Sequence, residues 1–272
     1  MLKITHPDYI LPIIEGLVAG RVLSSGRTRP MIIQGVCRQT GLKGEYVVKL
    51  KGSNHLWQGS SQNEILGSFL ASELGFQVPE PVIVNISDEF AETMERHENY
   101  KVASRSLGYN FGSTLQNGYQ ELLSGQPLNK DLQSRLLDLF AFDVLIGNTD
   151  RRGDKPNFLT NGEDLLIFDH ELAFSFTQQL SFARNPSPWL ILPGDIQWLK
   201  ENFCYQQLKG NSHNFSNFVD RLSVINETFW KKAWLSIPED WRNEHFDVIR
   251  EYLTRVIEHR NEFATELKRV LL

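Results

Sequence analysis

The order of strand-like and helix-like patterns is the feature that most constrains the fold of this chain. The runs "MIIQGVCR" (31–38) and "EYVVKLKG" (45–52) are β-prone, and the two glycines of the intervening "QTGLKG" suit a hairpin. A weaker strand precedes them within 16–30, and "VPEPVIVNIS" (78–87) reads as another. Between these strands, 60–75 has the apolar spacing of a helix that ends at a glycine. The first part of the chain is therefore predicted to be a small β-rich unit with one helix.

The remainder of the chain is rich in helix patterns. The stretch "DLQSRLLDLFAFDVLIGN" (131–148) is apolar on most faces, which is typical of a buried helix, and 214–272 carries patterns for two or three more. We therefore expect an α+β fold with a small β-rich unit over 1–90 and a larger helical unit over 91–272. A cleft between two such units is a natural ligand site.

A second informative feature is the stretch "FDVLIGNTDRRGDKPNFLTNGEDLLIFDHELAF", residues 142–174. Asp150 and Asn157 lie in a polar loop that follows a predicted helix, and Asp169 ends a short apolar run. Carboxylate and amide oxygens are the ligands that Mg²⁺ prefers, and a carboxylate in such a loop can orient an attacking hydroxyl. A solvated loop does not require this order of residues. The stretch therefore predicts phosphate transfer assisted by a metal ion.

The β-rich unit supplies the cation that such chemistry requires. Lys49 stands among apolar neighbours on a predicted strand, and a lysine in a buried strand needs an anionic partner. Lys51 is expected to point to the opposite face of the strand and is the weaker candidate. Glu64 on the following helix is the predicted partner of Lys49, with Glu73 as its rival. Transfer from ATP uses such a lysine on the phosphates and such an acid to hold it, so we expect ATP and Mg²⁺ as the bound ligands.

Four segments of the chain carry a resemblance to a known family. "VVKLKG", "NEILGSFLASELGFQVPEPVIV", "IGNTDRRGDKPNFL" and "LIFDHELAF" resemble the HipA-like kinases, and more closely their short bacterial subgroup, over roughly residues 15–180. The resemblance implies a two-lobed protein-kinase-like fold, with a small β-rich N-lobe and a larger helical C-lobe. It also implies Ser/Thr protein kinase activity. Several members of the family are toxins of toxin–antitoxin systems.

The resemblance also implies roles for individual residues. Asp150 corresponds to the catalytic base, and the adjacent Arg151 is expected to stabilise the catalytic loop or the γ-phosphate. Asn157 and Asp169 correspond to the magnesium ligands. Lys49 corresponds to the lysine that contacts the phosphates. His170 and Glu171 follow Asp169 in place of Phe-Gly, so the activation switch of eukaryotic kinases is not expected here.

The loop "SSGRTRP" is expected to bind the phosphates of the nucleotide. It lacks the G-x-G-x-x-G pattern of many kinases, but the backbone amides at Gly26 and the side chain of Arg27 or Arg29 can still contact phosphate. Ser24 and Ser25 belong to the same loop. In HipA-like kinases a serine of the corresponding loop is autophosphorylated, which switches the activity off.

The spacing within the predicted catalytic loop departs from the usual one. Asn157 lies seven residues after the predicted base, two more than in the common kinase loop. We expect a bulge at Gly153 and Asp154, with glycine at positive φ and Pro156 closing it. The bulge would bring the Asn157 amide oxygen within about 5 Å of an Asp169 carboxylate, so that one metal ion can bind both. The rival interpretation is that Asp154 serves the metal and Asn157 only starts the next strand.

Two other functions remain open from the sequence. The order "NTDR", then Asn, then "FDHELAF" also resembles the core of type II phosphatidylinositol 4-kinases, which makes a lipid or small-molecule kinase the nearest enzymatic rival. No cysteine cluster for palmitoylation and no basic amphipathic helix support that rival. The irregular loop spacing favours a third interpretation, a nucleotide-binding regulatory module without turnover.

Composition limits the partners and the compartment that we expect. The net charge of -5, from 28 Lys+Arg and 33 Asp+Glu, argues against direct nucleic-acid binding. No apolar run is long enough to span a membrane, and Cys37 and Cys204 lack metal-ligand spacing, so we expect a cytoplasmic protein with reduced thiols. Through the family resemblance we expect a protein substrate, such as a translation factor or an aminoacyl-tRNA synthetase, and an antitoxin or another operon-encoded partner.

Overall fold

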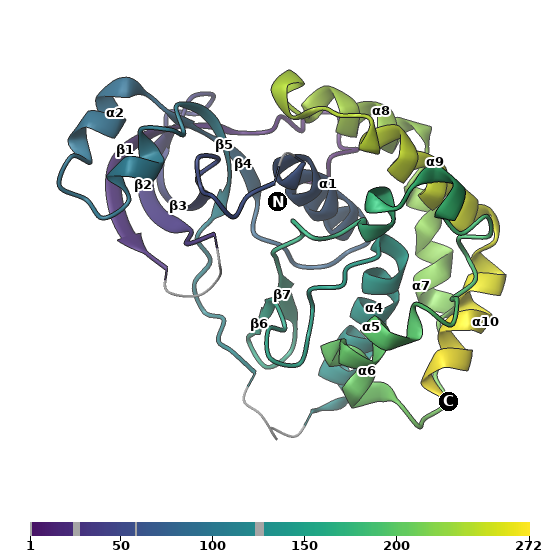
Figure 1. The fold of residues 1–272 in the computed structure, drawn as a ribbon. Helices are drawn as coiled ribbons and strands as arrows, with labels where there is room; N and C mark the ends of the chain where they lie inside the picture. Colours follow the sequence, from purple (N-terminus) through teal and green to yellow (C-terminus); the bar gives the residue numbers. More distant parts are fainter. Residues whose placement is uncertain (1, 24–27, 58, 123–127) are drawn as a thin grey trace.

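The computed structural model describes residues 2–23, 28–57, 59–122 and 128–272, and it is a mixed α+β fold with a small β-rich region beside a helical one (Figure 1). The strands of the β-rich region close into a barrel in the order β1-β2-β3-β5-β4. Their bounds are β1 Ile13–Val22, β2 Met31–Cys37, β3 Lys43–Lys49, β4 Pro81–Ile86 and β5 Gly108–Thr114.

The barrel confirms the strands that the sequence predicted and adds one that it did not. β2 and β3 form the expected antiparallel hairpin, and Gly41 in its connection has a φ of 69° that favours glycine. β4 pairs in parallel with β1 and antiparallel with β5. β5 was not predicted, and it lies beyond residue 90 although it pairs with both β3 and β4. A division at residue 90 would therefore separate this strand from its own sheet. Two short helices, α2 Asp88–Thr93 and α3 Tyr100–Ala103, stand between β4 and β5.

Helix α1, Ser60–Glu73, lies between the barrel and the helical region (Figure 1). The sequence predicted one apolar face, but every residue of the helix except Ser61 is buried. Its polar side is covered because it contacts the segment after β7; the Asn63 amide, for example, donates to the Ala173 carbonyl at 2.8 Å. Buried polar groups need such partners, so the polar side of α1 is directed at the site described below.

The helical region begins with α4, Lys130–Ile146, as the sequence predicted. The Asn129 side chain caps its first turn by accepting from the Leu132 N–H, and Gly147 ends it in the left-handed region with a φ of 58°. The described part of 214–272 holds four α-helices rather than two or three. The α-helices after α4 are α5 Ile196–Glu201, α6 Phe203–Leu208, α7 Ser216–Arg221, α8 Glu227–Ser236, α9 His245–Glu258 and α10 Arg260–Leu271; short 3₁₀ turns lie at Ser175–Gln178, Ser181–Ala183, Leu222–Val224 and Glu239–Trp241.

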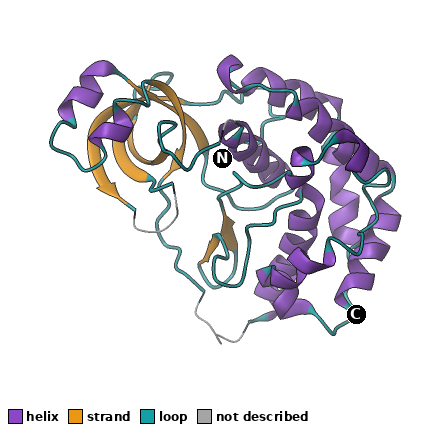
Figure 2. Ribbon diagram, viewed as in Figure 1, coloured by secondary structure: helices purple, strands orange, loops and turns teal. Residues whose placement is uncertain are grey.

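A second, two-stranded sheet stands apart from the barrel (Figure 2). It consists of β6, Phe158–Thr160, and β7, Leu165–Ile167, and both strands lie within the segment 142–174 identified above. The residues just before β6 and just after β7 therefore lie close together. Within the described ranges, no helix combines the length and the apolar character needed to cross a membrane.

Candidate active site

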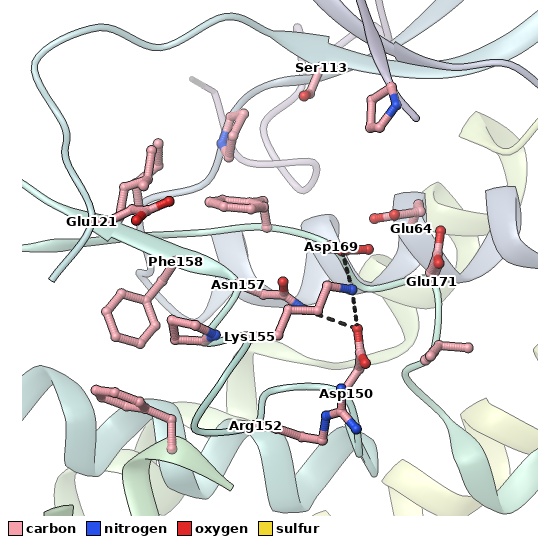
Figure 3. Close-up of a pocket in the computed structure, with 18 of the residues that line it drawn as sticks. Glu64, Ser113, Glu121, Asp150, Arg152, Lys155, Asn157, Phe158, Asp169 and Glu171 are labelled. Atoms are coloured by element: carbon pink, nitrogen blue, oxygen red, sulfur yellow. Dashed lines mark hydrogen bonds and ion pairs between the residues drawn. The ribbon is translucent and has the colours of Figure 1, made fainter. Parts of the chain in front are cut away.

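A large cavity lies between the barrel, α1 and the segments around the small sheet. Its volume is about 1660 Å³, which exceeds the usual range for a small-molecule site. The barrel contributes Val47, Lys49 and Ser113 to its lining, and α1 contributes Glu64. The opposite wall comes from the segments around the small sheet and from α5 and α6: Thr149, Asp150, Arg152 to Phe158, Phe168, Asp169, Glu171, Trp198, Glu201, Phe203, Gln206 and Gln207 all line it. Figure 3 shows several of these side chains facing one another.

Lys49, at the end of β3, binds three carboxylates at once. Its ammonium forms an ion pair with Glu64, lies 2.6 Å from Asp169 and lies 3.0 Å from Glu171. Burial lowers the pKa of Lys49, but these three carboxylates raise it well above its ordinary value. The predicted contact between Lys49 and Glu64 is therefore present, and Lys49 is charged at neutral pH.

The rival candidates for these two positions lie elsewhere. Lys51 lies in the turn after β3, its ammonium is 3.5 Å from the place that a Cβ at Gly108 would occupy, and it does not line the cavity. Glu73 accepts from the Thr5 N–H at 2.8 Å near the N-terminal segment. Glu64 and Glu73 are nine residues apart and therefore lie on opposite sides of α1. The reason expected for Lys51 was wrong, because residues two apart on a strand face the same side; Lys51 lies apart because β3 ends at Lys49.

Glu64 connects the barrel lysine to the segment after β7. One carboxylate oxygen contacts Lys49, and the other accepts from the His170 N–H at 2.9 Å. Burial raises the pKa of Glu64 to about 7, against the opposing effect of Lys49. The His170 ring is fully buried, packs edge-on against Phe142 at 6.1 Å between ring centroids, and has no hydrogen-bond partner among the described residues. His170 therefore acts through packing, and its backbone positions Glu64.

Asp150 and Asp169 lie in the same cavity and are bridged by Lys155. The Lys155 ammonium lies 2.6 Å from the Oδ2 atom of Asp150 and 3.1 Å from the Oδ2 atom of Asp169 (Figure 3). The Asn157 amide donates to the same Asp150 oxygen at 3.2 Å. Burial would raise the pKa of Asp169, but Lys49 and Lys155 hold it well below its ordinary value. The four side chains therefore form one connected polar group in which Asp169 is ionised.

The spacing within this loop is accommodated by a tight turn at the predicted place. Arg152 and Lys155 pair across Gly153 and Asp154, with the Arg152 N–H donating to the Lys155 carbonyl at 3.2 Å and the reverse bond at 3.1 Å. The predicted reason for the glycine was wrong, because Gly153 is not among the residues with positive φ. A Cβ there would instead approach the Gln206 side-chain oxygen to 2.8 Å. Glycine leaves room for α6 to pack closely against the turn, although the flexible Gln206 side chain could move to admit a Cβ.

Asn157 faces the cavity rather than forming part of the next strand. It precedes β6, which begins at Phe158, and its side chain lines the cavity together with Asp169. Asn157 and Asp169 both have backbone conformations in the left-handed region, with φ values of 49° and 64°. Such conformations cost energy for residues other than glycine and cluster at functional sites. The strain is therefore located at the two positions predicted to bind the metal.

The prediction that Arg151 contacts the γ-phosphate was wrong. Its side chain is fully buried behind the loop, and its Nε donates to both oxygens of Asp143 on α4, at 2.9 and 2.8 Å. Its Nη1 donates to the backbone carbonyls of Pro156 and Asn157 at 2.8 and 2.6 Å. Arg151 thus points away from the cavity that the neighbouring Asp150 lines. Arg151 therefore stabilises the loop, the other role that its position suggested.

Oxygen ligands for a divalent metal are present at the site. Carboxylate oxygens of Glu64, Asp169 and Glu171 lie within 4.8 Å of one another, and the carboxylate of Asp150 and the amide of Asn157 stand nearby across Lys155. All are hard ligands of the kind that Mg²⁺ binds. The residues present therefore fit a magnesium ion.

Sequence reasoning missed two charged residues of the site. Lys155 and Glu171 were not predicted to take part, although each lies within two residues of a predicted metal ligand, which was the available signal. The predicted phosphate-loop residues Ser24, Ser25, Gly26 and Arg27 lie outside the described residues. Leu23 and Thr28, on either side of them, both line the cavity.

The sequence profile of one protein family matches most of the chain. No curated protein matches the chain. A sequence profile of the HipA-like kinases matches residues 18–267, which include every described residue of the site from Lys49 to Glu171. A match of this extent covers both the barrel and the helical region. The chain therefore belongs to the HipA-like kinase family.

Proposed function

We propose that this protein is a Mg²⁺- and ATP-dependent kinase that phosphorylates a serine or threonine hydroxyl of a protein substrate. Membership of the family implies a kinase, with ATP as the phosphate donor and a divalent metal. The observation that carries the proposal is the meeting of Asp150, Asp169 and the paired Lys49 in one cavity. Phosphoryl transfer requires positioning and charge stabilisation more than covalent chemistry, and these three groups supply both.

Each group has a distinct task in the proposed reaction. Lys49, held by Glu64, contacts the phosphates of ATP. Asp169 and Asn157 hold the metal, which neutralises phosphate charge when it is bound. Asp150 accepts a hydrogen bond from the substrate hydroxyl, orients its oxygen toward the transferred phosphate and receives its proton. Arg151 keeps the loop in place from behind through Asp143 and the loop carbonyls.

We also propose that the two regions act as the lobes of a protein-kinase-like fold. The N-lobe would comprise the barrel with α1, α2 and α3, and the C-lobe the helices from α4 onward and the small sheet. Because β5 belongs to the barrel, the boundary falls after Thr114 rather than at residue 90. ATP would bind between the lobes, where β3, the end of β5 and the catalytic loop all line the cavity.

The family suggests the biological setting. We propose a cytoplasmic kinase that acts on a protein such as a translation factor or an aminoacyl-tRNA synthetase, as the toxin of a toxin–antitoxin pair. The loop that holds Ser24 and Ser25 would then be the place of autophosphorylation. The acidic net charge of -5 is consistent with a protein substrate rather than a nucleic acid.

Incubation with ATP labelled at the γ-phosphate, alone and with cell lysate, tests the proposal. We expect label on serine or threonine of a protein acceptor with the wild type and none with Asp169→Asn. Label in a lipid or a small molecule would instead support the rival kinase. Nucleotide binding without any transfer would support a regulatory module.

A separate prediction concerns the contact between Lys49 and the nucleotide. We expect ATP to raise the unfolding temperature of the wild type, because a ligand that binds only the folded state stabilises it. Loss of a charged hydrogen bond costs about 1.5–3 kcal/mol, so the affinity of Lys49→Ala for ATP should be lower than that of the wild type by at least about tenfold. Glu64→Ala should show a smaller loss, since it removes the partner of Lys49 rather than the contact itself.

The matched control for this experiment is Lys51→Ala, two residues away in the turn after β3 and outside the lining of the cavity. Each variant is compared with its own ATP-free form, because loss of Lys49 also leaves three carboxylates without their common partner. Equal ATP protection in Lys49→Ala and the wild type would assign the phosphate contact to another residue.

A further inference from the structure

Lys155 is the charged group of the site that the proposed mechanism leaves without a task. Its ammonium contacts Asp150 at 2.6 Å and Asp169 at 3.1 Å, so it lies between the proposed base and a proposed metal ligand. Negative charge on the two carboxylates would be unfavourable without a cation between them. The Lys155 ammonium thus supplies the positive charge that the acids require when no metal is bound.

The position of Lys155 is held by its backbone and not by its side chain. It closes the tight turn with Arg152, and the carbonyl groups of the next two residues accept from the buried Arg151. The Lys155 side chain is 34% exposed, whereas those of Asp150 and Asp169 are 13% and 14% exposed. Because the backbone is fixed and the Lys155 side chain is flexible and partly exposed, its ammonium can move away from Asp150 and Asp169 without disturbing the loop.

Lys49 differs from Lys155 in this respect. It contacts three carboxylates and its side chain is only 12% exposed. Moving Lys49 away would leave Glu64 buried without its cation, which is costly. Of these two lysines, Lys155 is therefore the one that can exchange partners.

We propose that Lys155 makes metal binding depend on the nucleotide. In the nucleotide-free protein its ammonium competes with a divalent cation for the oxygens of Asp150 and Asp169. A triphosphate brings negative charge into the cavity and offers Lys155 another partner, which releases the two acids for the metal. Nucleotide and metal then strengthen each other's binding, as any coupling between two sites must be reciprocal. The inference rests on the proposed kinase function of this cavity.

Binding of Mn²⁺, measured by the electron paramagnetic resonance of the free ion, tests the inference without any turnover. In the absence of nucleotide, Lys155→Met should bind Mn²⁺ at least about tenfold more tightly than the wild type, because the competing charge is gone. Lys155→Arg keeps the charge and should bind Mn²⁺ as weakly as the wild type. Lys51→Met, which removes a lysine in the turn after β3 that does not line the cavity, should leave the affinity unchanged.

The second half of the experiment adds a non-hydrolysable ATP analogue. The wild type should then gain at least about tenfold in Mn²⁺ affinity, and Lys155→Met should gain less, because it has no competing ammonium to release. Lys155→Gln, which keeps a polar side chain, replaces Lys155→Met if the latter does not fold by circular dichroism. Unchanged or weaker Mn²⁺ binding in the neutral variants, or tighter binding in Lys155→Arg as well, would overturn the inference. The labelled-ATP assay is scored separately, so absence of transfer alone would contradict only the kinase proposal.

Discussion

Replacing Asp150 with asparagine should reduce phosphate transfer by about 10²–10⁴-fold, the usual contribution of a positioned general base. The substitution keeps the size of the side chain but removes the carboxylate that orients the substrate hydroxyl and receives its proton. ATP binding should change little, because Lys49 and Asp169 remain in place on the other side of Lys155. Single-turnover transfer from labelled ATP measures the first effect, and protection against thermal unfolding measures the second.

Two variants provide the comparison for this result. Asp154→Asn lies on the same turn, is 73% exposed and has only a 3.4 Å contact with Arg152, so it should transfer phosphate at the wild-type rate. A large loss in that variant would favour Asp154 as the residue that serves the metal. Asp169→Asn should instead weaken Mg-ATP binding, because it removes a charged metal ligand. Wild-type transfer in both Asp150→Asn and Asp169→Asn would refute the kinase proposal.

Replacing Arg151 with methionine should lower the free energy of unfolding by about 3–5 kcal/mol, as expected when one partner of a buried ion pair is removed. Arg151 and Asp143 are both fully buried and joined by two hydrogen bonds. Burial raises the pKa of Asp143, and Arg151 opposes that rise, so the loss of Arg151 leaves a buried acid without its counter-ion. Urea denaturation of the purified variant measures the change.

The neighbouring Arg152→Met is the matched control, because the Arg152 side chain is 42% exposed and its contact with Asp154 is long. Substitutions of that kind change stability by about 0.5 kcal/mol or less. Adding Asp143→Asn to Arg151→Met should recover part of the lost stability, since an amide needs no counter-ion and still accepts from Asn202. A stability loss below about 1 kcal/mol in Arg151→Met would show that the pair does not hold the loop.

Local patterns in the sequence were sufficient for several elements. The predicted ranges agree closely with β2, β3, β4, α1 and α4. The patterns that predicted them are runs of β-branched residues, helical spacing of apolar residues and a glycine at the helix end, and each pattern depends only on neighbouring residues. Strand alternation does not separate Lys49 from Lys51, because residues two apart face the same side of a strand; Lys51 lies apart because β3 ends at Lys49. The family and the α+β class also followed from short motifs read in order.

Other features depended on residues far apart in the chain. β5 has no strong strand pattern of its own, and it forms because β3 and β4 offer it two edges. The polar side of α1 is buried because the segment after β7 covers it, and no pattern within α1 itself predicts that contact. The turn at Gly153 is tight because Gln206 of α6 packs against it.

The sequence by itself determined which chemical groups this protein has for phosphate chemistry and their order along the chain. Only the tertiary structure decided how neighbouring groups divide their tasks. Arg151 and Arg152 are adjacent and chemically alike, yet one is buried against Asp143 and the other lines the cavity. Lys155, which no motif singled out, contacts both Asp150 and Asp169. The physical reason is that charge acts through space, so the partner of an ionised side chain is set by the packing of distant segments and not by the spacing of residues along the chain.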